Sequence, residues 1–215
     1  MAKSRPRVIL SSAMSIDGKI ATRTGRSRLS SDKDLVRVHG LRGKVDAILV
    51  GRKTVAVDNP SLTTRRTKGP NPIRIILDPS ASISVNSKIV KTSRKVPTTL
   101  VVSQKARARR ILLLSRKGLQ VIRCGRTRID LGRLLDILAG QGIKKILVEG
   151  GGITNWYFFE EGLVDEIIVT IAPYVIGGRE SVSLVEGLGF GNISYSFRLK
   201  QIRRAGNEIV LHYVA

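Results

Sequence analysis

Short apolar runs recur along the whole sequence, and segments with helical spacing separate several of them. The runs that favour β-strands fall at residues 7–13, 47–50, 73–77, 98–102, 119–122, 145–148, 165–171, 197–203 and 209–214. The helix-like segments fall at residues 31–42, 106–115, 131–139 and 154–161. Strands that alternate with helices indicate an α/β fold with a mainly parallel central sheet flanked by helices. We expect one domain that covers residues 1–215.

The end of the chain follows a different pattern, because its last two strand-like runs are almost adjacent. The segment between them, 204–208, holds Gly206 and Asn207, and both residue types favour tight turns. The sequence therefore predicts a C-terminal antiparallel hairpin.

The net charge of +22, from 38 Lys and Arg against 16 Asp and Glu, is the strongest compositional signal. Such an excess suits a polyanionic partner, and a basic nucleic-acid-binding protein is one hypothesis. Aromatic residues make up only 4% of the chain, so few side chains are available to stack on bases. The basic residues are also dispersed, as at 65–66, 144–145 and 203–204. We therefore favour an enzyme with phosphorylated ligands and expect no specific nucleic-acid partner.

The lengths of the apolar runs and the number of cysteines limit where the protein can be located and which metal sites it can form. The longest apolar runs are far shorter than the ~20 residues that span a bilayer, so no membrane partner is expected. The start of the chain is basic but has only a short apolar run, 8–10, which indicates a first strand rather than a signal peptide. The single cysteine, Cys124, excludes an internal disulfide and a Cys-rich zinc site. We expect a cytoplasmic protein without a metal ion.

One carboxylate and three glycines lie where a strand gives way to a helix: Glu149 is followed by Gly150, Gly151 and Gly152. In α/β sheets, ligands bind beyond the carboxyl ends of the strands. Glycines let the backbone approach a phosphate there, and a helix N-terminus attracts negative charge. The pattern is neither GxGxxG nor a Walker motif, so a tight strand–helix junction is the alternative. Glu149 requires a partner, either a ligand hydroxyl or amine or a backbone group.

A second cluster follows the strand-like run at 47–50. Thr54 and Asp58 are one helical turn apart, so both can face one ligand, and the next residues, Asn59 and Pro60, end the element. Arg65 lies on the following loop and suits a phosphate, because its guanidinium offers a planar fork of donors. A solvated loop charge is the alternative for Arg65.

The blocks that carry these residues occur in a distinctive order. They are AMSIDGKIA (13–21), LR (41–42), DAILVGRKTVAVDNPSLTTR (46–65), RIILD (74–78), ILVEGGG (146–152), GLVDE (162–166) and APYVIGG (172–178). Taken together they resemble the riboflavin-biosynthesis pyrimidine reductases, from about residue 7 to residue 180. The resemblance implies a dihydrofolate-reductase-like fold, NADPH as the cofactor with NADH as the alternative, and a homodimer.

The resemblance also implies a particular reaction. The sequence has no His-x-Glu or Pro-Cys-x-x-Cys motif of the deaminase to which bacterial members are often fused. It is therefore similar to the free-standing form, which reduces before deamination. The expected reaction is the reduction of 2,5-diamino-6-ribosylamino-4(3H)-pyrimidinone 5′-phosphate to the ribitylamino product. A deaminated pyrimidine or a pterin-like compound is the alternative substrate.

The family's functional positions carry over residue by residue. The implied cofactor-binding residues are Thr54, Asp58, Gly150, Gly151, Gly152, Ile153 and Thr154. The implied substrate-binding residues are Ser27, Arg42, Leu62, Arg65 and Glu149.

Hydride transfer to C1′ of the opened ribose needs positioning and a proton donor. Our hypotheses are that Arg65, together with Arg42, holds the 5′-phosphate and that Glu149 binds the pyrimidine amino edge or a sugar hydroxyl. Glu149 and Asp17 are the catalytic candidates, with Asp32 as a further possible proton donor. The two histidines, 39 and 212, are expected to be structural.

Overall fold

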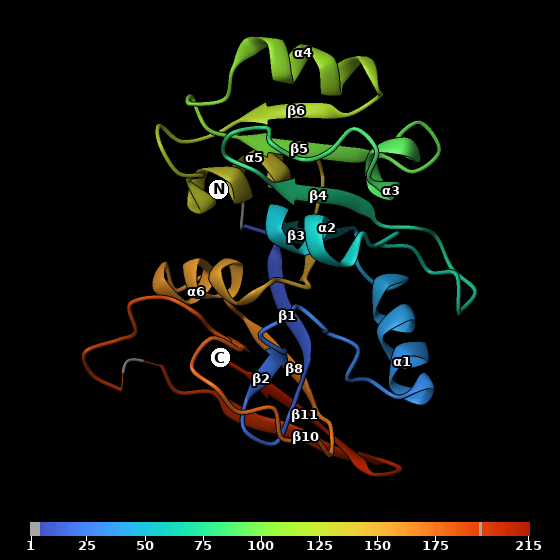
Figure 1. Ribbon diagram of the computed structural model, residues 1–215, viewed down its shortest axis with the longest axis vertical. Coiled ribbons are helices and arrows are strands. Elements are labelled where there is room, and N and C mark those ends of the chain that lie inside the picture. Colours follow the sequence, from blue (N-terminus) through green and yellow to red (C-terminus); the bar gives the residue numbers. More distant parts are fainter. Residues whose placement is uncertain (1–4, 194) are drawn as a thin grey trace.

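The computed structural model describes residues 5–193 and 195–215, and its main feature is one nine-stranded sheet (Figure 1). The strand order is β10-β11-β8-β1-β7-β3-β4-β5-β6. The strands are β1 (Arg7–Met14), β3 (Ala47–Gly51), β4 (Ile73–Leu77), β5 (Thr98–Val102), β6 (Gln120–Arg123), β7 (Lys145–Val148), β8 (Glu166–Ile171), β10 (Arg198–Ala205) and β11 (Glu208–Val214). All pairs from β8 to β6 are parallel, whereas β11 pairs antiparallel with β8 and with β10. The predicted mainly parallel sheet and its C-terminal hairpin are confirmed.

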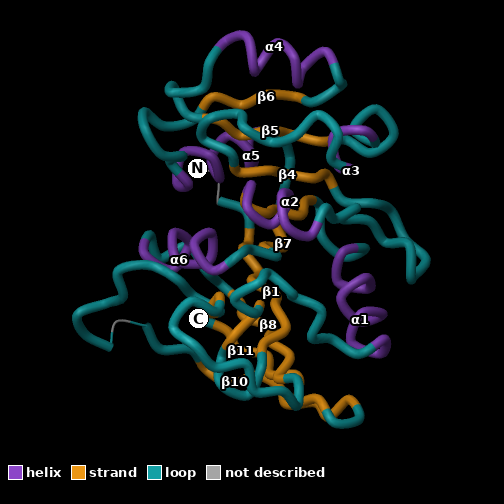
Figure 2. Tube along the Cα trace, in the orientation of Figure 1, coloured by secondary structure: helices purple, strands orange, loops and turns teal. Residues whose placement is uncertain are grey.

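Helices cover both faces of this sheet (Figure 2). They are α1 (Asp32–Arg42), α2 (Arg52–Asp58), α3 (Lys88–Lys91), α4 (Ala108–Arg116), α5 (Leu131–Gly140) and α6 (Gly152–Glu160). No helix in the described part of the chain is long and apolar enough to cross a bilayer. The sequence patterns did not predict α3 or the small second sheet of β2 (Lys19–Ala21) and β9 (Val182–Ser183). Elements of two to four residues are too short to carry a periodic signal.

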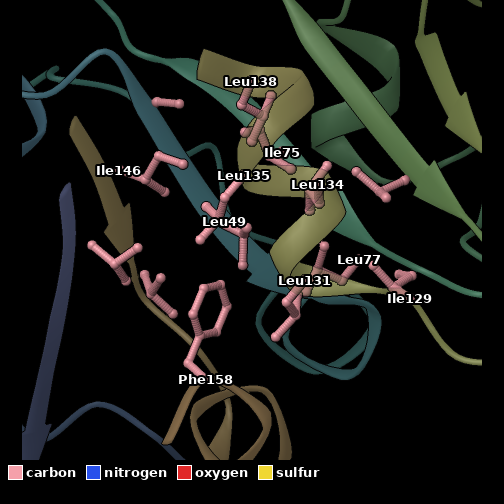
Figure 3. Close-up of a cluster of buried hydrophobic side chains, with 14 of the residues drawn as sticks. Leu49, Ile75, Leu77, Ile129, Leu131, Leu134, Leu135, Leu138, Ile146 and Phe158 are labelled. Carbon is pink, nitrogen blue, oxygen red and sulfur yellow. The ribbon is translucent and has the colours of Figure 1, made fainter. Parts of the chain in front are cut away.

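Alternate residues of the parallel strands point into two separate cores. Ala47 and Leu49 of β3 belong to a first core, which α5 and α6 cover with side chains such as Leu134 (Figure 3). Ile48 and Val50 belong to a second core, which α2, α3 and α4 cover. Because both faces are buried, these strands are continuously apolar, as expected for a parallel sheet between two helical layers.

The carboxyl ends of β3 and β7 lie next to each other, because the two strands pair in parallel. The chain leaves β3 at Gly51 and enters α2, and it leaves β7 through Glu149 to reach α6. Two backbone hydrogen bonds join the loops: Glu149 N–H donates to Leu49 O (3.0 Å) and Gly51 N–H to Gly150 O (3.1 Å). The fold therefore brings the two sequence clusters together at one edge of the sheet.

Candidate active site

The glycine loop takes a backbone path that other residues rarely adopt. Gly150 and Gly151 have φ values of 44° and 86°, both in the left-handed region. A Cβ atom on Gly150 would overlap the side chain of Asn155, and one on Gly151 would lie 3.0 Å from Thr54 Oγ1. Glycine is required here for both the backbone conformation and the space beside it.

Gly151 caps the start of α6 without a side-chain hydrogen bond, and no side chain among the described residues accepts from the first-turn N–H groups. Ile153 in that turn is exposed, whereas Thr154 is buried. Thr54 lies directly beside the loop, where its hydroxyl donates to Gly150 O (2.9 Å). Five of the predicted cofactor residues, 54 and 150–153, thus line one glycine-walled corner that suits a phosphate group.

Glu149 is held by Arg42, from the far end of α1. The guanidinium donates from Nε to Oε1 (2.8 Å) and from Nη2 to Oε2 (2.6 Å), and Nη1 donates to Thr63 O (3.1 Å). The side chains of Arg42 and Glu149 are only 11% and 14% exposed. Burial lowers the pKa of Arg42, but the neighbouring Glu149 carboxylate outweighs it and the net pKa is raised. Two predicted substrate residues, 107 positions apart, therefore form one rigid unit.

Ser27 and Asp58 also meet in the structure. The Ser27 hydroxyl donates to Asp58 Oδ1 (2.6 Å), which joins a predicted substrate residue to a predicted cofactor residue. Asn59 ends α2 in the left-handed conformation and its side chain accepts from Lys88 N–H (2.7 Å). The predicted helix break after Asp58 is confirmed, and Ser27 reaches the C-terminal end of α2.

The loop that follows α2 presents its two predicted substrate residues differently. Leu62 has a φ of 51° and its side chain is 2% exposed in the second core, so only its backbone can face a ligand. Arg65 is exposed, and no hydrogen bond or ion pair to another described residue engages its side chain. Arg65 is thus available for a ligand phosphate, whereas the guanidinium of Arg42 is already engaged by Glu149.

Sequence reasoning missed the residue that anchors this loop, Arg74. Its side chain is completely buried in β4, and burial lowers its pKa to about 10. It donates to Ser61 O (3.1 Å), one residue before Leu62, and also to Thr98 and Thr92 hydroxyls. The signal was present, because an arginine within the apolar run 73–77 requires buried partners.

Asp17 and Asp32 are poor proton donors in this structure. The Asp17 carboxylate accepts from Ser15 Oγ (2.6 Å) and from the backbone N–H groups of Ile176 (3.0 Å) and Gly177 (2.7 Å). These hydrogen bonds lower its pKa to about 2, so it stays ionised and ties the β1–β2 turn to residues 176–177. Asp32 is exposed and pairs with Arg66 (3.1 Å). Asp32 is the first residue of α1 and Arg42 is the last, so about 15 Å of helix separates Asp32 from the Arg42–Glu149 pair's end of α1.

Three further residues near the site, Asn155, Glu186 and His39, were not predicted to have a role there. The Asn155 amide donates to Leu184 O (2.7 Å), which holds the segment after β9 against the start of α6. Glu186 N–H donates to Gly152 O (3.0 Å) in the same region. His39 is buried within α1, and burial together with the charges of Arg42 and Arg65 lowers its pKa to about 4. No sequence pattern marks these long-range contacts.

The described residues contain no group of three or more His, Cys, Asp or Glu side chains placed to hold a metal ion. The site instead combines a glycine-walled corner, a helix start, a held carboxylate and an exposed arginine. Such a set can bind a phosphorylated cofactor and orient a polar, phosphorylated substrate beside it.

Comparison with known proteins identifies relatives along the whole chain. The family described as the RibD C-terminal domain matches residues 6–211. A relative from Methanothermobacter thermautotrophicus, named 2,5-diamino-6-ribosylamino-4(3H)-pyrimidinone 5′-phosphate reductase, is 41% identical over 214 residues. That alignment covers 97% of this chain and 98% of the relative.

Solved structures share the fold. Acinetobacter baumannii RibD superposes with a TM-score of 0.82 at 24% identity, over 98% of this chain and 58% of the RibD chain. This chain thus spans little more than half of that protein's length. Dihydrofolate reductase from Enterococcus faecalis, solved with NADP(H), superposes with a TM-score of 0.56 at 13% identity, over 97% of this chain and 95% of the other. The expected dihydrofolate-reductase-like fold is confirmed.

Proposed function

Since the chain belongs to the RibD C-terminal domain family, we propose that it is a reductase of riboflavin biosynthesis that acts on 2,5-diamino-6-ribosylamino-4(3H)-pyrimidinone 5′-phosphate. The observation that carries this proposal is the 41% identity to a reductase of that name over nearly the whole of both chains. The Glu149–Arg42 unit supports it, because it places a hydrogen-bond acceptor next to the glycine loop.

The cofactor is a nicotinamide nucleotide, and we propose NADPH. The site fits such a cofactor, because a Cβ on Gly151 would fill the space between the loop and Thr54. Thr54, Asp58 and residues 150–154 would hold the cofactor, with its phosphates near the first turn of α6. When bound, the nicotinamide would supply the hydride for C1′, and a proton taken up from water would complete the conversion of the ribosylamino group into a ribitylamino group. A comparison of kcat/KM for NADPH and NADH tests the preference for the 2′-phosphate.

The substrate is held by groups that the structure leaves available. Glu149, fixed by Arg42, keeps acceptor lone pairs for the pyrimidine amino edge or a sugar hydroxyl. Arg65 is exposed and has no hydrogen-bond or ion-pair partner in the described part of the chain, so we assign the 5′-phosphate to Arg65, whereas Arg42 holds Glu149. Ser27, held by Asp58, is the remaining substrate contact at the C-terminal end of α2.

Of the two proposed catalytic acids, Glu149 is retained and Asp17 is reassigned. The Asp17 carboxylate accepts a hydrogen bond from Gly177 N–H and so holds a turn, whereas Glu149 lies beside the glycine loop. We propose that Glu149 acts by orienting the substrate's opened ribosylamine.

The deciding assay follows oxidation of NADPH with the diamino substrate and, in parallel, with its deaminated analogue. Faster oxidation with the diamino compound is expected. Faster oxidation with the deaminated compound would mean that the protein reduces the pyrimidine after its deamination. Absence of oxidation with either, in a folded sample that retards RNA on a gel, would favour the nucleic-acid-binding hypothesis.

Substitution of Arg65 by alanine tests the phosphate assignment. We expect KM for the phosphorylated substrate to rise by about 10- to 100-fold, because a charge-assisted hydrogen bond is worth about 1.5–3 kcal/mol. The affinity for NADPH should stay within about twofold of the original, since Arg65 lies outside the glycine-walled corner. An unchanged KM would remove Arg65 from this role. Arg66→Ala is the matched control, because Arg66 pairs with Asp32 instead.

We further propose that residues 1–215 act as one reductase domain, in the cytoplasm and as a homodimer, as the family resemblance suggests. Sedimentation at several protein concentrations tests the oligomeric state.

A further inference from the structure

The side chain of Asn155 lies where the glycine loop, α6 and the segment after β9 meet. It is 1% exposed and belongs to the first turn of α6. Its amide Nδ2 donates to Leu184 O (2.7 Å), which is 29 residues further along the chain. The same amide lies against Gly150, because a Cβ atom on Gly150 would overlap Asn155 Oδ1. One buried side chain therefore contacts both the glycine loop and a segment that is distant in the sequence.

The hydrogen bond to Leu184 fixes how this amide is turned. Nδ2 must face the carbonyl oxygen of Leu184, so Oδ1 is left facing Gly150. Oδ1 is buried and has no hydrogen-bond partner among residues 5–193 and 195–215. An unpaired acceptor costs stability and offsets part of what the hydrogen bond contributes. The amide is thus better explained by the orientation that it fixes than by the stability that it adds.

Gly150 has two further supports, and both hold its carbonyl group. Gly150 O accepts from Gly51 N–H (3.1 Å) and from Thr54 Oγ1 (2.9 Å). Asn155 packs against its Cα instead. Gly150 and Gly151 lead directly into the first turn of α6, so these contacts together fix where the first-turn N–H groups point.

Residues 184–187, the backing segment, are themselves held against α6. Glu186 N–H donates to Gly152 O (3.0 Å), and a Cβ atom on Gly187 would overlap the ring of Trp156. Figure 1 shows the loop between β8 and β10 running alongside α6. The backing segment is therefore a fixed support for a side chain that projects from α6.

We propose that Asn155 is a positioning residue for the cofactor. By linking Gly150 to the backing segment, its amide keeps the glycine loop in the form that receives the phosphates of the nicotinamide nucleotide. The identity of that ligand rests on the proposed function. Asn155 does not touch the cofactor itself, since its side chain is buried. A loop that is ordered before binding loses less conformational entropy when the ligand arrives, so its affinity is higher.

Substitution Asn155→Leu keeps the shape of the side chain and removes its donor. In the cofactor-free protein, we expect the Gly51 amide proton to exchange about tenfold faster, because its acceptor is Gly150 O. The Ile73 amide proton, which bonds to Asp46 O at the amino end of β4, should exchange as before. Hydrogen exchange followed by NMR measures both. Unchanged exchange at Gly51 would overturn the proposal.

The affinity for NADPH is the second readout for Asn155→Leu. We expect the Kd in a fluorescence titration to rise about tenfold, the most that one neutral hydrogen bond provides, whereas kcat at saturating NADPH should stay within about twofold. A lower unfolding temperature with an unchanged Kd would mean that Asn155 serves the fold alone and would contradict the positioning role. Failure of the unaltered protein to bind NADPH would instead count against the proposed function, and the exchange at Gly51 would still decide the role of Asn155.

Ser93→Ala is the matched control for stability. Ser93 is 4% exposed, and its hydroxyl donates to Lys117 O (2.7 Å). It lies at the amino ends of the strands, since Lys117 precedes β6, whereas the glycine loop lies at their carboxyl ends. The variant therefore loses a buried hydroxyl away from the site. We expect the Kd for NADPH to stay within about twofold, and a rise of about tenfold would show that destabilisation alone weakens binding and would overturn the proposal.

A pair of glycines tests the backing segment without changing Asn155. Neither Gly187 nor Gly191 has a left-handed backbone, so alanine causes no strain of that kind at either. Gly187→Ala places a methyl group against the ring of Trp156 and should push the segment away from α6, whereas the methyl group of Gly191→Ala meets nothing within 4 Å. We expect the Kd for NADPH to rise at least about fivefold in Gly187→Ala and to stay unchanged in Gly191→Ala. Equal affinities in the two variants would contradict the proposal, and this pair decides if Asn155→Leu does not fold.

Discussion

The ion pair between Glu149 and Arg42 fixes the orientation of the carboxylate in the candidate site. Glu149 is attached to β7, but its orientation is set by Arg42 on α1, through two hydrogen bonds of 2.8 and 2.6 Å. Because the pair is largely buried, removing either charge leaves the other without compensation. The pair therefore stabilises the fold, and we propose that it also fixes the position of the substrate.

Substitution Glu149→Gln separates these two effects. We expect the free energy of unfolding to fall by about 3 kcal/mol, since Arg42 is left as an uncompensated buried charge. We expect kcat/KM to fall by about 100-fold, equivalent to about 2.7 kcal/mol of lost transition-state binding. Urea unfolding and steady-state kinetics measure the two. Asp32→Asn is the matched control, because it breaks the exposed pair with Arg66 and should cost less than about 1 kcal/mol. Equal losses in the two variants would contradict the role of Glu149.

The buried side chain of His39 should make the stability of the folded protein depend on pH. Its pKa of about 4 in the folded protein lies below the ordinary value of 6.5 for histidine, so the unfolded chain binds the proton more readily. The contribution of neutral His39 to the free energy of unfolding is complete above about pH 6.5. As the pH falls towards 4 this contribution is lost, and the loss reaches about 3 kcal/mol. The midpoint of urea unfolding should therefore drop steeply across this window. His39→Gln should flatten the curve. An unchanged slope in His39→Gln would disprove the assignment.

At the scale of the element, we propose that the β7–α6 junction requires glycine for ligand binding as well as for the turn. Gly151 and Gly142 have nearly the same φ, 86° and 84°, but a Cβ on Gly142 meets nothing within 4 Å. The two positions therefore form a matched pair, because alanine causes the same backbone strain at both. Only at Gly151 does the methyl group enter the glycine-walled corner.

Gly151→Ala and Gly142→Ala test this difference. Both should lose about 1 kcal/mol of stability from the left-handed backbone. The affinity for NADPH should fall by at least about tenfold in Gly151→Ala only, since the methyl group narrows the approach to α6. Fluorescence titration with NADPH measures this. A similar affinity in both variants would show that the glycines serve the turn alone.

Apolar periodicity predicted the elements far better than it predicted the contacts between them. The continuous apolar run at 145–148 and the helical spacing at 131–139 correspond closely to β7 and α5. The start of α6 lies two residues earlier than predicted, at Gly152, because Gly151 provides the cap. The pair of Arg42 and Glu149 spans 107 residues, and no local pattern encodes such a contact.

At the scale of the whole molecule, the site exists because the strand order brings distant segments together. β7 inserts between β1 and β3, although about 90 residues lie between β3 and β7 in the sequence. The glycine loop, the α2 cluster and the end of α1 meet only after that insertion. The family resemblance could therefore propose candidate site residues, but no sequence pattern predicts how Ser27 meets Asp58 or how Arg74 holds the loop after α2.

The net charge of +22 makes the stability of the whole molecule sensitive to salt. With 38 basic against 16 acidic residues, most positive charges have no ion-pair partner, and mutual repulsion should outweigh the few attractive pairs. Raising NaCl from about 20 mM to about 500 mM shortens the screening length severalfold, so the unfolding temperature should rise by a few °C.

Calorimetry at both salt concentrations measures this shift. The Arg107→Gln/Arg109→Gln variant removes two exposed positive charges, so it should start from a higher unfolding temperature in low salt and gain less from added salt. A fall in unfolding temperature with NaCl would mean that the attractive pairs, such as Arg5 with Asp165 (2.7 Å), dominate the electrostatic free energy of the fold. In that case the arrangement of the charges, and not the net charge of +22, determines how salt changes the stability of the fold.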